Sequence, residues 1–199
     1  MERPALIALH LQNDVLHENG KLALGLARQP ERRRSVLTAA GVLFAAARAA
    51  SIPLIHVRIA FSDGYSEAKG NGALFEAVRS AGALREGTWG AELHSGVDAL
   101  PGEVVLTHAN ISGFRGCGLG HHLERTRRHT LILCGVATNS SVEHTGREAA
   151  DIGFDVIVSE DACGSGRADL HAAALDNLRL VGRVSSLADL LSEMERSFG

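Results

Sequence analysis

The sequence predicts an α/β fold in which helices cover both faces of a mostly parallel, six-stranded sheet. Short apolar runs of strand length alternate along the chain with longer segments in which apolar residues recur every three or four positions. The apolar runs contain few polar residues, as strands do when helices bury both of their faces. Because each crossover between parallel strands places a helix on the sheet, this alternation indicates three layers.

The six predicted strands are short and mostly apolar, and they cover residues 5–11, 53–61, 103–107, 130–136, 154–159 and 180–184. Helical spacing predicts helices over residues 32–50, 73–80, 118–127, 142–152 and 170–178, with a last helix that begins at the capping pattern 186–189. Residues 12–14 are expected to form a polar turn, and Glu160-Asp161 to end the fifth strand. These elements together predict a Rossmann-like three-layer α/β/α sandwich.

Length and composition fit a single domain that spans residues 1–199. Hydrophobic residues make up 45% of the chain and charged residues 22%, as in ordinary globular proteins. The net charge of −3 and the 4% aromatic content give no basis for binding nucleic acid or an anionic membrane. No apolar run approaches the roughly 20 residues that span a membrane. The chain opens directly into a strand without a signal peptide, and its three cysteines lack metal-ligand spacing, so we expect a cytoplasmic protein with reduced thiols.

Three of the predicted strands end in side chains that are able to do chemistry. The first ends near His10, the third ends at His108, and the fourth runs through Gly135 into Thr138-Asn139-Ser140-Ser141. In α/β sheets, ligands bind where the carboxyl ends of strands meet helix N-termini. Each hydroxyl in the last segment also fits an ordinary helix cap. If the three strands are neighbours, their ends share one crevice, but spacing alone does not establish that they are.

The order of the motifs resembles the isochorismatase-like (cysteine hydrolase) superfamily, which includes nicotinamidases, N-carbamoylsarcosine amidases and isochorismatases. The resemblance extends over nearly the whole chain and rests on the segments LQND (11–14), VLTHANISGF (105–114), GVATNSSV (135–142), AADIGFDV (149–156) and EDAC (160–163). It implies a hydrolase of a small-molecule substrate and a homodimer or homotetramer. It also implies a cis peptide bond between Val136 and Ala137, and an oxyanion hole made by the backbone N–H groups of Ala137 and Ser141.

The chain departs from this family at three positions that carry the chemistry. The family's aspartate, lysine and cysteine are replaced by His10, His108 and Ser141, so the usual thiolate mechanism cannot operate. The replacements are chemically coherent, because a serine hydroxyl needs a stronger base than a thiol does, and imidazole is its usual partner. In this hypothesis His10 is the general base toward Ser141, and His108 supplies a positive charge or orients His10.

Three other functions remain open at this stage. His10 protonates a substrate, as in family members that act on vinyl ethers, while Ser141 only binds. Alternatively, His10 and His108 are two ligands of a metal ion. The metal-binding amidases of the family use an Asp-x-His pattern after the second strand, and residues 61–65 contain no histidine, so we expect no metal or other cofactor. Finally, the protein is an inactive family member that binds a small molecule.

Four further residues are candidates for binding the substrate because of their positions alone: Gln12, Trp89, Asn110 and Phe114. Gln12 flanks His10, and Asn110 and Phe114 follow His108. Trp89 lies in the long segment 62–101, and loops of that length are usually functional. The resemblance implies aromatic residues that pack on a small planar substrate, although Trp89 equally fits an anchor for its own loop.

Overall fold

The computed structural model describes residues 1–198 and contains a six-stranded sheet with the order β3-β2-β1-β4-β5-β6. All five strand pairs are parallel. The strands are β1 (Pro4–Leu9), β2 (Leu54–Ile59), β3 (Val104–His108), β4 (Thr130–Val136), β5 (Asp155–Gly164) and β6 (Arg183–Ser185). This arrangement confirms the predicted α/β fold with its parallel sheet.

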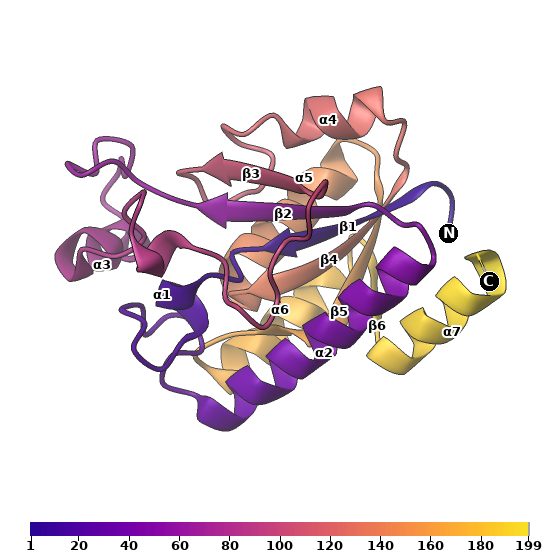
Figure 1. Cartoon of the computed structure of the whole chain (residues 1–199), viewed down its shortest axis with the longest axis horizontal. Coiled ribbons are helices and arrows are strands. Elements are labelled where there is room, and N and C mark those ends of the chain that lie inside the picture. The colour runs from indigo at the N-terminus through magenta and orange to yellow at the C-terminus, as the bar shows by residue number, and fades with distance from the viewer. Residues whose placement is uncertain (199) are drawn as a thin grey trace.

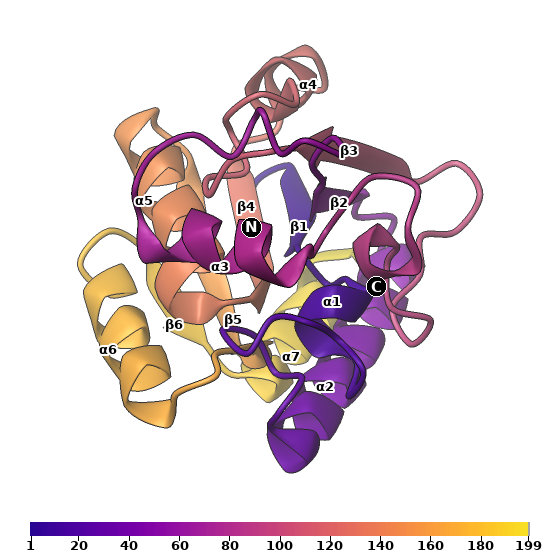
Figure 2. The same ribbon diagram turned by 90° about the vertical axis from the view of Figure 1, so that its left-hand side faces the viewer.

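Helices cover both faces of the sheet, as the alternating pattern predicts. In Figure 2, α2 and α7 lie on one side of the sheet, and α4, α5 and α6 lie on the other. The helices are α1 (Asn13–Leu16), α2 (Pro30–Ala49), α3 (Ala73–Ala81), α4 (Leu119–Arg125), α5 (Glu143–Asp151), α6 (Ala168–Leu178) and α7 (Leu187–Phe198). No helix in the described part of the chain is long and apolar enough to cross a membrane.

The two central strands, β1 and β4, are buried along their whole length. Their sequences, PALIAL and TLILCGV, are nearly continuous apolar runs because helices bury both faces of a parallel sheet. The strand order reverses direction between β1 and β4, which makes their carboxyl ends the switch point where ligands bind in such sheets. In Figure 1 the strand arrowheads point toward α1 and α3, which lie at this end of the molecule.

Three local predictions are wrong. Residues 12–14 do not form a simple turn, because Asn13–Leu16 is the short helix α1. The fifth strand does not end at Glu160-Asp161 but continues to Gly164, since a register shift next to it lets Gly135 and Val136 of β4 pair with its end. The sixth strand begins only at Arg183, because residues 180–182 form the turn that closes α6.

Candidate active site

His10 occupies the first position after β1 and is held there by the backbone. Its φ is +53°, a left-handed conformation that turns the chain away from the sheet. Its N–H donates a hydrogen bond to the carbonyl of Val57 at 2.8 Å, which ties this corner to β2. The His10 side chain is buried, with 4% of its surface exposed. The imidazole therefore has little freedom to leave the carboxyl end of the sheet.

Ser141 lies in an irregular turn between β4 and α5. The peptide bond from Val136 to Ala137 is cis, as the resemblance implies. The chain then makes a single π-helical turn, Thr138–Val142, in which the N–H of Val142 reaches the carbonyl of Ala137 at 3.3 Å. Such wide turns often occur at functional sites. This one buries Ser141, which is 6% exposed, beneath the end of β1.

His108 is the last residue of β3, which lies beyond β2 and is not adjacent to β1. It pairs in register with Ile59 at the end of β2. Its buried ring spans the end of that strand and brings its Nε2 atom to 2.7 Å from Nε2 of His10. The three residues at the predicted strand ends thus form one cluster, which spacing in the sequence leaves undetermined.

The hydrogen bonds of this cluster run in one direction. The carbonyl oxygen of Arg115 lies 3.1 Å from His108 Nδ1 and can only accept, so this nitrogen carries the proton of the neutral ring. His108 Nε2 is then an acceptor, and His10 Nε2 donates to it. That leaves His10 Nδ1 as an acceptor for the Ser141 hydroxyl, 2.7 Å away. The network therefore assigns His10 the tautomer that a general base requires.

The Arg115 carbonyl that anchors this series is itself held in place. The Arg115 side chain pairs with Glu148 of α5, with Nε 2.7 Å from Oε1. The other oxygen of Glu148 accepts a hydrogen bond from Ser112 Oγ. Ser112 and Arg115 belong to the same turn, because the N–H of Arg115 donates to the carbonyl of Ser112. Glu148 thus fixes the loop that determines the tautomer of His108.

Burial keeps both histidines neutral. The pKa of His10 lies well below its ordinary value of 6.5, chiefly because burial disfavours the cation and further because His108 is close by. Burial also lowers the pKa of His108, and its hydrogen bonds to the backbone of Arg115 and Ser112 offset only part of this effect. Among the described residues, no carboxylate forms a hydrogen bond with either ring. His108 therefore contacts His10 as a neutral ring and not as a cation.

His10 and Ser141 open onto a cavity of about 480 Å³. This volume falls within the range typical of sites for small molecules. Apolar side chains from α3, from the loop that follows α1 and from the end of β2 line most of its wall. The uncharged polar lining residues are His10, Asn110, Asn139, Ser140, Ser141 and Ser165, and Arg167 is the charged one. The arrangement places a buried hydroxyl and a neutral imidazole at one end of a largely apolar chamber.

A family model for the isochorismatase domain matches residues 4–189 of this chain. The chain belongs to the isochorismatase family. A ureidoacrylate amidohydrolase, RutB, of Enterobacter sp. (strain 638) is 31% identical over 206 residues, covering 94% of this chain and 87% of the relative. The isochorismatase family protein YecD of Escherichia coli O157:H7 is 29% identical over 191 residues, which is 96% of this chain and 95% of YecD.

Solved structures of isochorismatase-family proteins share the fold. A protein from Desulfovibrio vulgaris aligns with a TM-score of 0.86 and 24% identity, covering 98% of this chain and all of its own. The nicotinamidase PncA of Bacillus subtilis aligns with a TM-score of 0.77 and 22% identity, covering 92% of this chain and 99% of its own. These likenesses agree with the predicted Rossmann-like architecture.

Only one of the four predicted substrate-binding residues lines the cavity. Asn110 does, whereas Gln12, Trp89 and Phe114 do not. The buried amide of Gln12 is used instead to join two distant segments: it accepts from the N–H of Ile59 and donates to the carbonyls of Ile59 and Ala91.

The two aromatic residues that were predicted to bind the substrate, Trp89 and Phe114, contact other side chains instead. Trp89 is 46% exposed and contacts the edge of the His17 ring, with ring centroids 4.9 Å apart. Phe114 stacks on Phe154, with centroids 5.9 Å apart. The aromatic side chain that lines the cavity is Phe75 of α3, beside Leu74 and Val78. The only sequence signal for these three residues is the apolar spacing of the predicted helix 73–80.

None of the three cysteines is placed to act as a nucleophile at the cavity. Cys134 and Cys163 are buried in β4 and β5, and Cys117 is half-buried beyond β3. Burial raises the pKa of Cys134 well above its usual value and that of Cys163 to about 12, so both remain thiols. None of the three lines the cavity among the described residues. The candidate nucleophile at the cavity is therefore the Ser141 hydroxyl, which contacts His10.

The two histidines contact each other directly rather than surrounding a site for an ion. Two nitrogens that ligate one zinc ion at about 2.0–2.1 Å in tetrahedral geometry lie roughly 3.3 Å apart, whereas the His10 and His108 Nε2 atoms are separated by 2.7 Å. Within residues 1–198, no group of three or more His, Cys, Asp or Glu side chains is arranged to hold a metal. This separation fits a hydrogen bond and not a shared ion.

Proposed function

We propose that this isochorismatase-family hydrolase cleaves an ester or amide bond of a small molecule, with Ser141 as nucleophile and His10 as general base. His108 acts as a positioning residue for His10. The observation that carries the proposal is the directional series of hydrogen bonds from the Ser141 hydroxyl through both rings to the Arg115 carbonyl. Two similar proteins, a ureidoacrylate amidohydrolase and a nicotinamidase, support including amides among the candidate substrates.

The reaction proceeds in two acyl-transfer steps. Ser141 Oγ attacks the substrate carbonyl carbon while its proton passes to His10 Nδ1. As the tetrahedral intermediate collapses, the bond to the leaving alcohol or amine breaks, and that group takes the proton from Nδ1. His10 then removes a proton from water, whose oxygen attacks the acyl-serine. Collapse releases the carboxylic acid, and the proton returns to Ser141 Oγ.

The two ring nitrogens of His10 have exchanged roles relative to the histidine of a Ser-His-Asp triad. There the serine faces Nε2 and the carboxylate faces Nδ1, whereas here Ser141 faces Nδ1 of His10 and Nε2 faces a second imidazole. When His10 takes up the serine proton, the positive charge spreads over two hydrogen-bonded rings. The end of this series is a carbonyl dipole, that of Arg115.

Backbone N–H groups of the turn are the proposed oxyanion hole. Ala137 and Ser141 both line the cavity next to the serine hydroxyl. Donors of this kind contribute about 3–4 kcal/mol each to stabilising the negative oxygen of the intermediate. Because these donors belong to the backbone, replacing the family cysteine with serine leaves them available.

The protonation state of His10 favours base catalysis over acid catalysis. A histidine whose pKa lies well below 6.5 is neutral at pH 7, so it accepts a proton readily but seldom has one to donate at the start of a reaction. The route in which His10 protonates a vinyl ether needs the opposite state. The same property supports a neutral, orienting role for His108.

A second candidate function is that of a binding protein without turnover. The observation that favours it is that no carboxylate in the described chain supports the imidazolium that would form on His10. Such a protein keeps the cavity and binds a small molecule there. Catalytic turnover that depends on Ser141 distinguishes the two functions.

The test is a screen of p-nitrophenyl esters and anilides with the wild type, Ser141→Ala and Ser35→Ala. We expect Ser141→Ala to lower kcat by a factor on the order of 10⁴, while Ser35→Ala, on the exposed side of α2, retains wild-type activity. Undiminished activity in Ser141→Ala refutes the serine mechanism. Ligand-induced thermal stabilisation without turnover of any substrate supports the binding protein instead.

We also propose, from the family resemblance, that the chain forms a homodimer or homotetramer. From its length, charge and composition we propose that it acts as one domain, residues 1–199, and works in the cytoplasm on a small-molecule substrate without nucleic acid or a membrane as partner. Light scattering coupled to size-exclusion chromatography tests the assembly: a mass near 21 kDa contradicts it, and two or four times that mass supports it.

A further inference from the structure

The wall of the active-site cavity is built mainly of hydrocarbon. Helix α3 contributes Leu74, Phe75 and Val78, the loop after α1 contributes Leu22 and Leu24, and the end of β2 contributes Ile59. These side chains come from three separate segments that meet over the carboxyl end of the sheet. An apolar surface of this kind gains free energy by excluding water from a hydrocarbon group but offers no partner to a charged one.

Charge at the cavity is confined to its edge. Of the lining residues in the described chain, Arg167 is the one whose side chain is charged at neutral pH. Its side chain is 67% exposed, and both oxygens of Asp169 accept hydrogen bonds from it. The Arg167 guanidinium is therefore neutralised and solvated. It does not provide a buried partner for a substrate carboxylate, and no lining carboxylate provides one for an ammonium group.

Both asparagines that line the cavity use one atom of their amide to bind the protein itself. Asn139 Oδ1 accepts a hydrogen bond from Ser165 Oγ at 2.6 Å, and Asn110 Nδ2 donates to the carbonyl of Arg115 at 3.3 Å. The remaining polar positions surround the serine hydroxyl, where the reacting carbonyl group would lie. The uncharged polar groups of the site therefore lie at the serine end of the chamber, and the rest of the wall is suited to a nonpolar group.

From this distribution we infer that the substrate is an uncharged ester or amide carrying a hydrocarbon group, and that the chamber formed by α3, the loop after α1 and the end of β2 binds that group. The cavity volume of about 480 Å³ accommodates a chain of about four to eight carbons with the reacting group. The bond cleavage in this inference rests on the function proposed above, but the binding of the hydrocarbon group does not.

The kinetic test uses two series of esters with the wild-type protein. One series lengthens the acyl chain from p-nitrophenyl acetate to octanoate, and the other lengthens the alcohol from ethyl to octyl acetate. We expect kcat/KM to rise about fourfold per added methylene, the equivalent of about 0.8 kcal/mol for each buried CH₂, in the series whose chain enters the chamber. A rise in either series supports the inference and identifies which side of the bond is bound. Turnover that is flat or falls with length in both series overturns it.

A binding test separates this inference from the proposed mechanism. The Ser141→Ala protein is titrated calorimetrically with hexanamide, acetamide, hexanoate and hexylammonium. We expect hexanamide to bind at least tenfold more tightly than the other three. If hexanamide binds in this way but no ester is turned over, the hydrolase mechanism fails and the inference stands. If esters are turned over but the charged hexyl compounds bind as tightly as hexanamide, the inference fails and the mechanism stands.

A pair of leucine variants locates the chamber. Leu74→Gln changes a half-buried lining residue of α3, and Leu180→Gln changes a leucine that is 80% exposed and lies outside the cavity. We expect Leu74→Gln to reduce the gain in kcat/KM or hexanamide affinity per methylene by at least half, and Leu180→Gln to leave that gain unchanged. Circular dichroism of both variants verifies that the comparison is made between folded proteins. An unchanged gain in folded Leu74→Gln contradicts the placement of the hydrocarbon group.

Discussion

Two buried histidines on adjacent strands have opposite surroundings. His10 follows β1, and His56 lies within β2, where it pairs in register with Ala8 of β1. The partners of His10 are a hydroxyl and a neutral imidazole, and the ring lines a cavity. The partner of His56 is the carboxylate of Glu103, with Nε2 3.2 Å from Oε2, and the ring does not line the active-site cavity.

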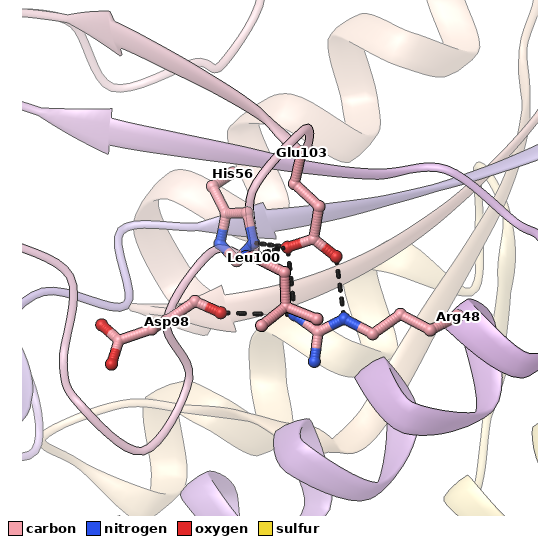
Figure 3. A network of polar contacts seen from close by, with 5 residues as sticks. All are labelled: Arg48, His56, Asp98, Leu100 and Glu103. Atoms are coloured by element: carbon pink, nitrogen blue, oxygen red, sulfur yellow. Dashed lines mark hydrogen bonds and ion pairs between the residues drawn. The ribbon is translucent and has the colours of Figure 1, made fainter.

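The carboxylate beside His56 is already neutralised by other groups. Figure 3 shows Arg48 from α2 reaching Glu103, with Nε 2.8 Å from Oε1 and an NH2 group 3.0 Å from Oε2. The N–H of Leu100 also donates to Glu103, and Arg48 donates to the carbonyl of Asp98. This network joins α2, β2 and the segment before β3. Among the residues drawn in Figure 3 there is no hydroxyl, and none of them lines the active-site cavity.

One feature distinguishes His10, the proposed general base, from His56 in this molecule. Burial lowers the pKa of both rings, so a shifted pKa does not separate them. What separates them is the group that each ring faces. His10 accepts a hydrogen bond from a hydroxyl at the edge of a cavity, whereas His56 contacts a carboxylate that also pairs with Arg48.

The largest expected difference between the two histidines is in catalysis. Changing His10→Gln removes the general base, and we expect kcat to fall on the order of 10³-fold. Changing His56→Gln leaves kcat within about threefold, because that ring is outside the site, although it lowers stability. Steady-state kinetics on the folded fraction of each variant measures both effects. Equal losses in the two variants would mean that His10 has no special role.

The next effect concerns stability and belongs to the Glu103 network. Arg48 and the hydrogen bonds to Glu103 lower the pKa of this largely buried carboxyl from 4.5 to about 2. A depressed carboxyl pKa stabilises the folded state above pH 4.5, and this contribution is lost as the pH falls toward 2. Glu103→Gln should therefore lower the free energy of unfolding by about 3 kcal/mol at pH 7, with a smaller difference from wild type at each pH below 4.5.

Denaturant unfolding between pH 7 and pH 2.5 measures this effect. Glu76→Gln, which removes an exposed pair with Arg79 on α3, is the matched control and should leave stability unchanged. If the difference in unfolding free energy between the wild type and Glu103→Gln stays constant over this pH range, ionised Glu103 does not stabilise the fold as we predict.

A smaller effect on rate, on the order of tenfold, is expected for His108→Ala, because His10 loses the acceptor that fixes its tautomer. Activity requires neutral His10, so kcat/KM falls on the acid side of a pKa that lies below 6.5 in the wild type. Removing His108 also removes its contribution to that lowering, so the acid limb of the profile should move to higher pH. His108→Gln, whose amide oxygen can accept from His10, should recover part of the rate. A pH profile identical to that of the wild type in His108→Ala would refute the coupling of the two rings.

The smallest predicted effect is on Glu148, which holds Arg115 in place at the end of the hydrogen-bond series from Ser141 through His10 and His108. Glu148→Gln weakens the hold on Arg115, and we expect kcat to fall about threefold with KM unchanged. Glu143→Gln changes an equally exposed glutamate on the same helix, which pairs with Arg147 instead. Kinetics on the two variants should therefore differ. If Glu143→Gln lowers kcat as much as Glu148→Gln does, the effect belongs to the helix and not to the anchor.

Most of the fold was predictable because its signals are local. The run of residues 130–136 was predicted with its observed bounds, since apolar residues fill it and a glycine-containing turn follows. The end of β5 was not predictable, because Glu160 and Asp161 interrupt the apolar pattern while the strand continues to buried Ala162 and Cys163. Its continuation depends on the register of β4, which no local pattern encodes.

The three residues at the centre of the candidate site were predictable from the sequence, but the residues that line its cavity were not. His10, His108 and Ser141 each follow a strand, which is a local signal, and their convergence depends on the strand order. The role of Gln12 was not predictable, because its amide bonds to backbone groups 47 and 79 residues away. The position of α3 over the cavity likewise depends on how a long loop folds back.

Covalent labelling of Ser141 by a fluorophosphonate, followed by mass spectrometry, tests the central claim most directly. We predict that the wild type gains one phosphonyl group on Ser141, that labelling slows as the pH falls below the pKa of His10, and that His10→Gln reacts far more slowly. The Ser141→Ala protein should remain unlabelled. A wild-type protein that does not react, or that reacts equally well in the absence of His10, would contradict the assignment of Ser141 as a nucleophile activated by this histidine.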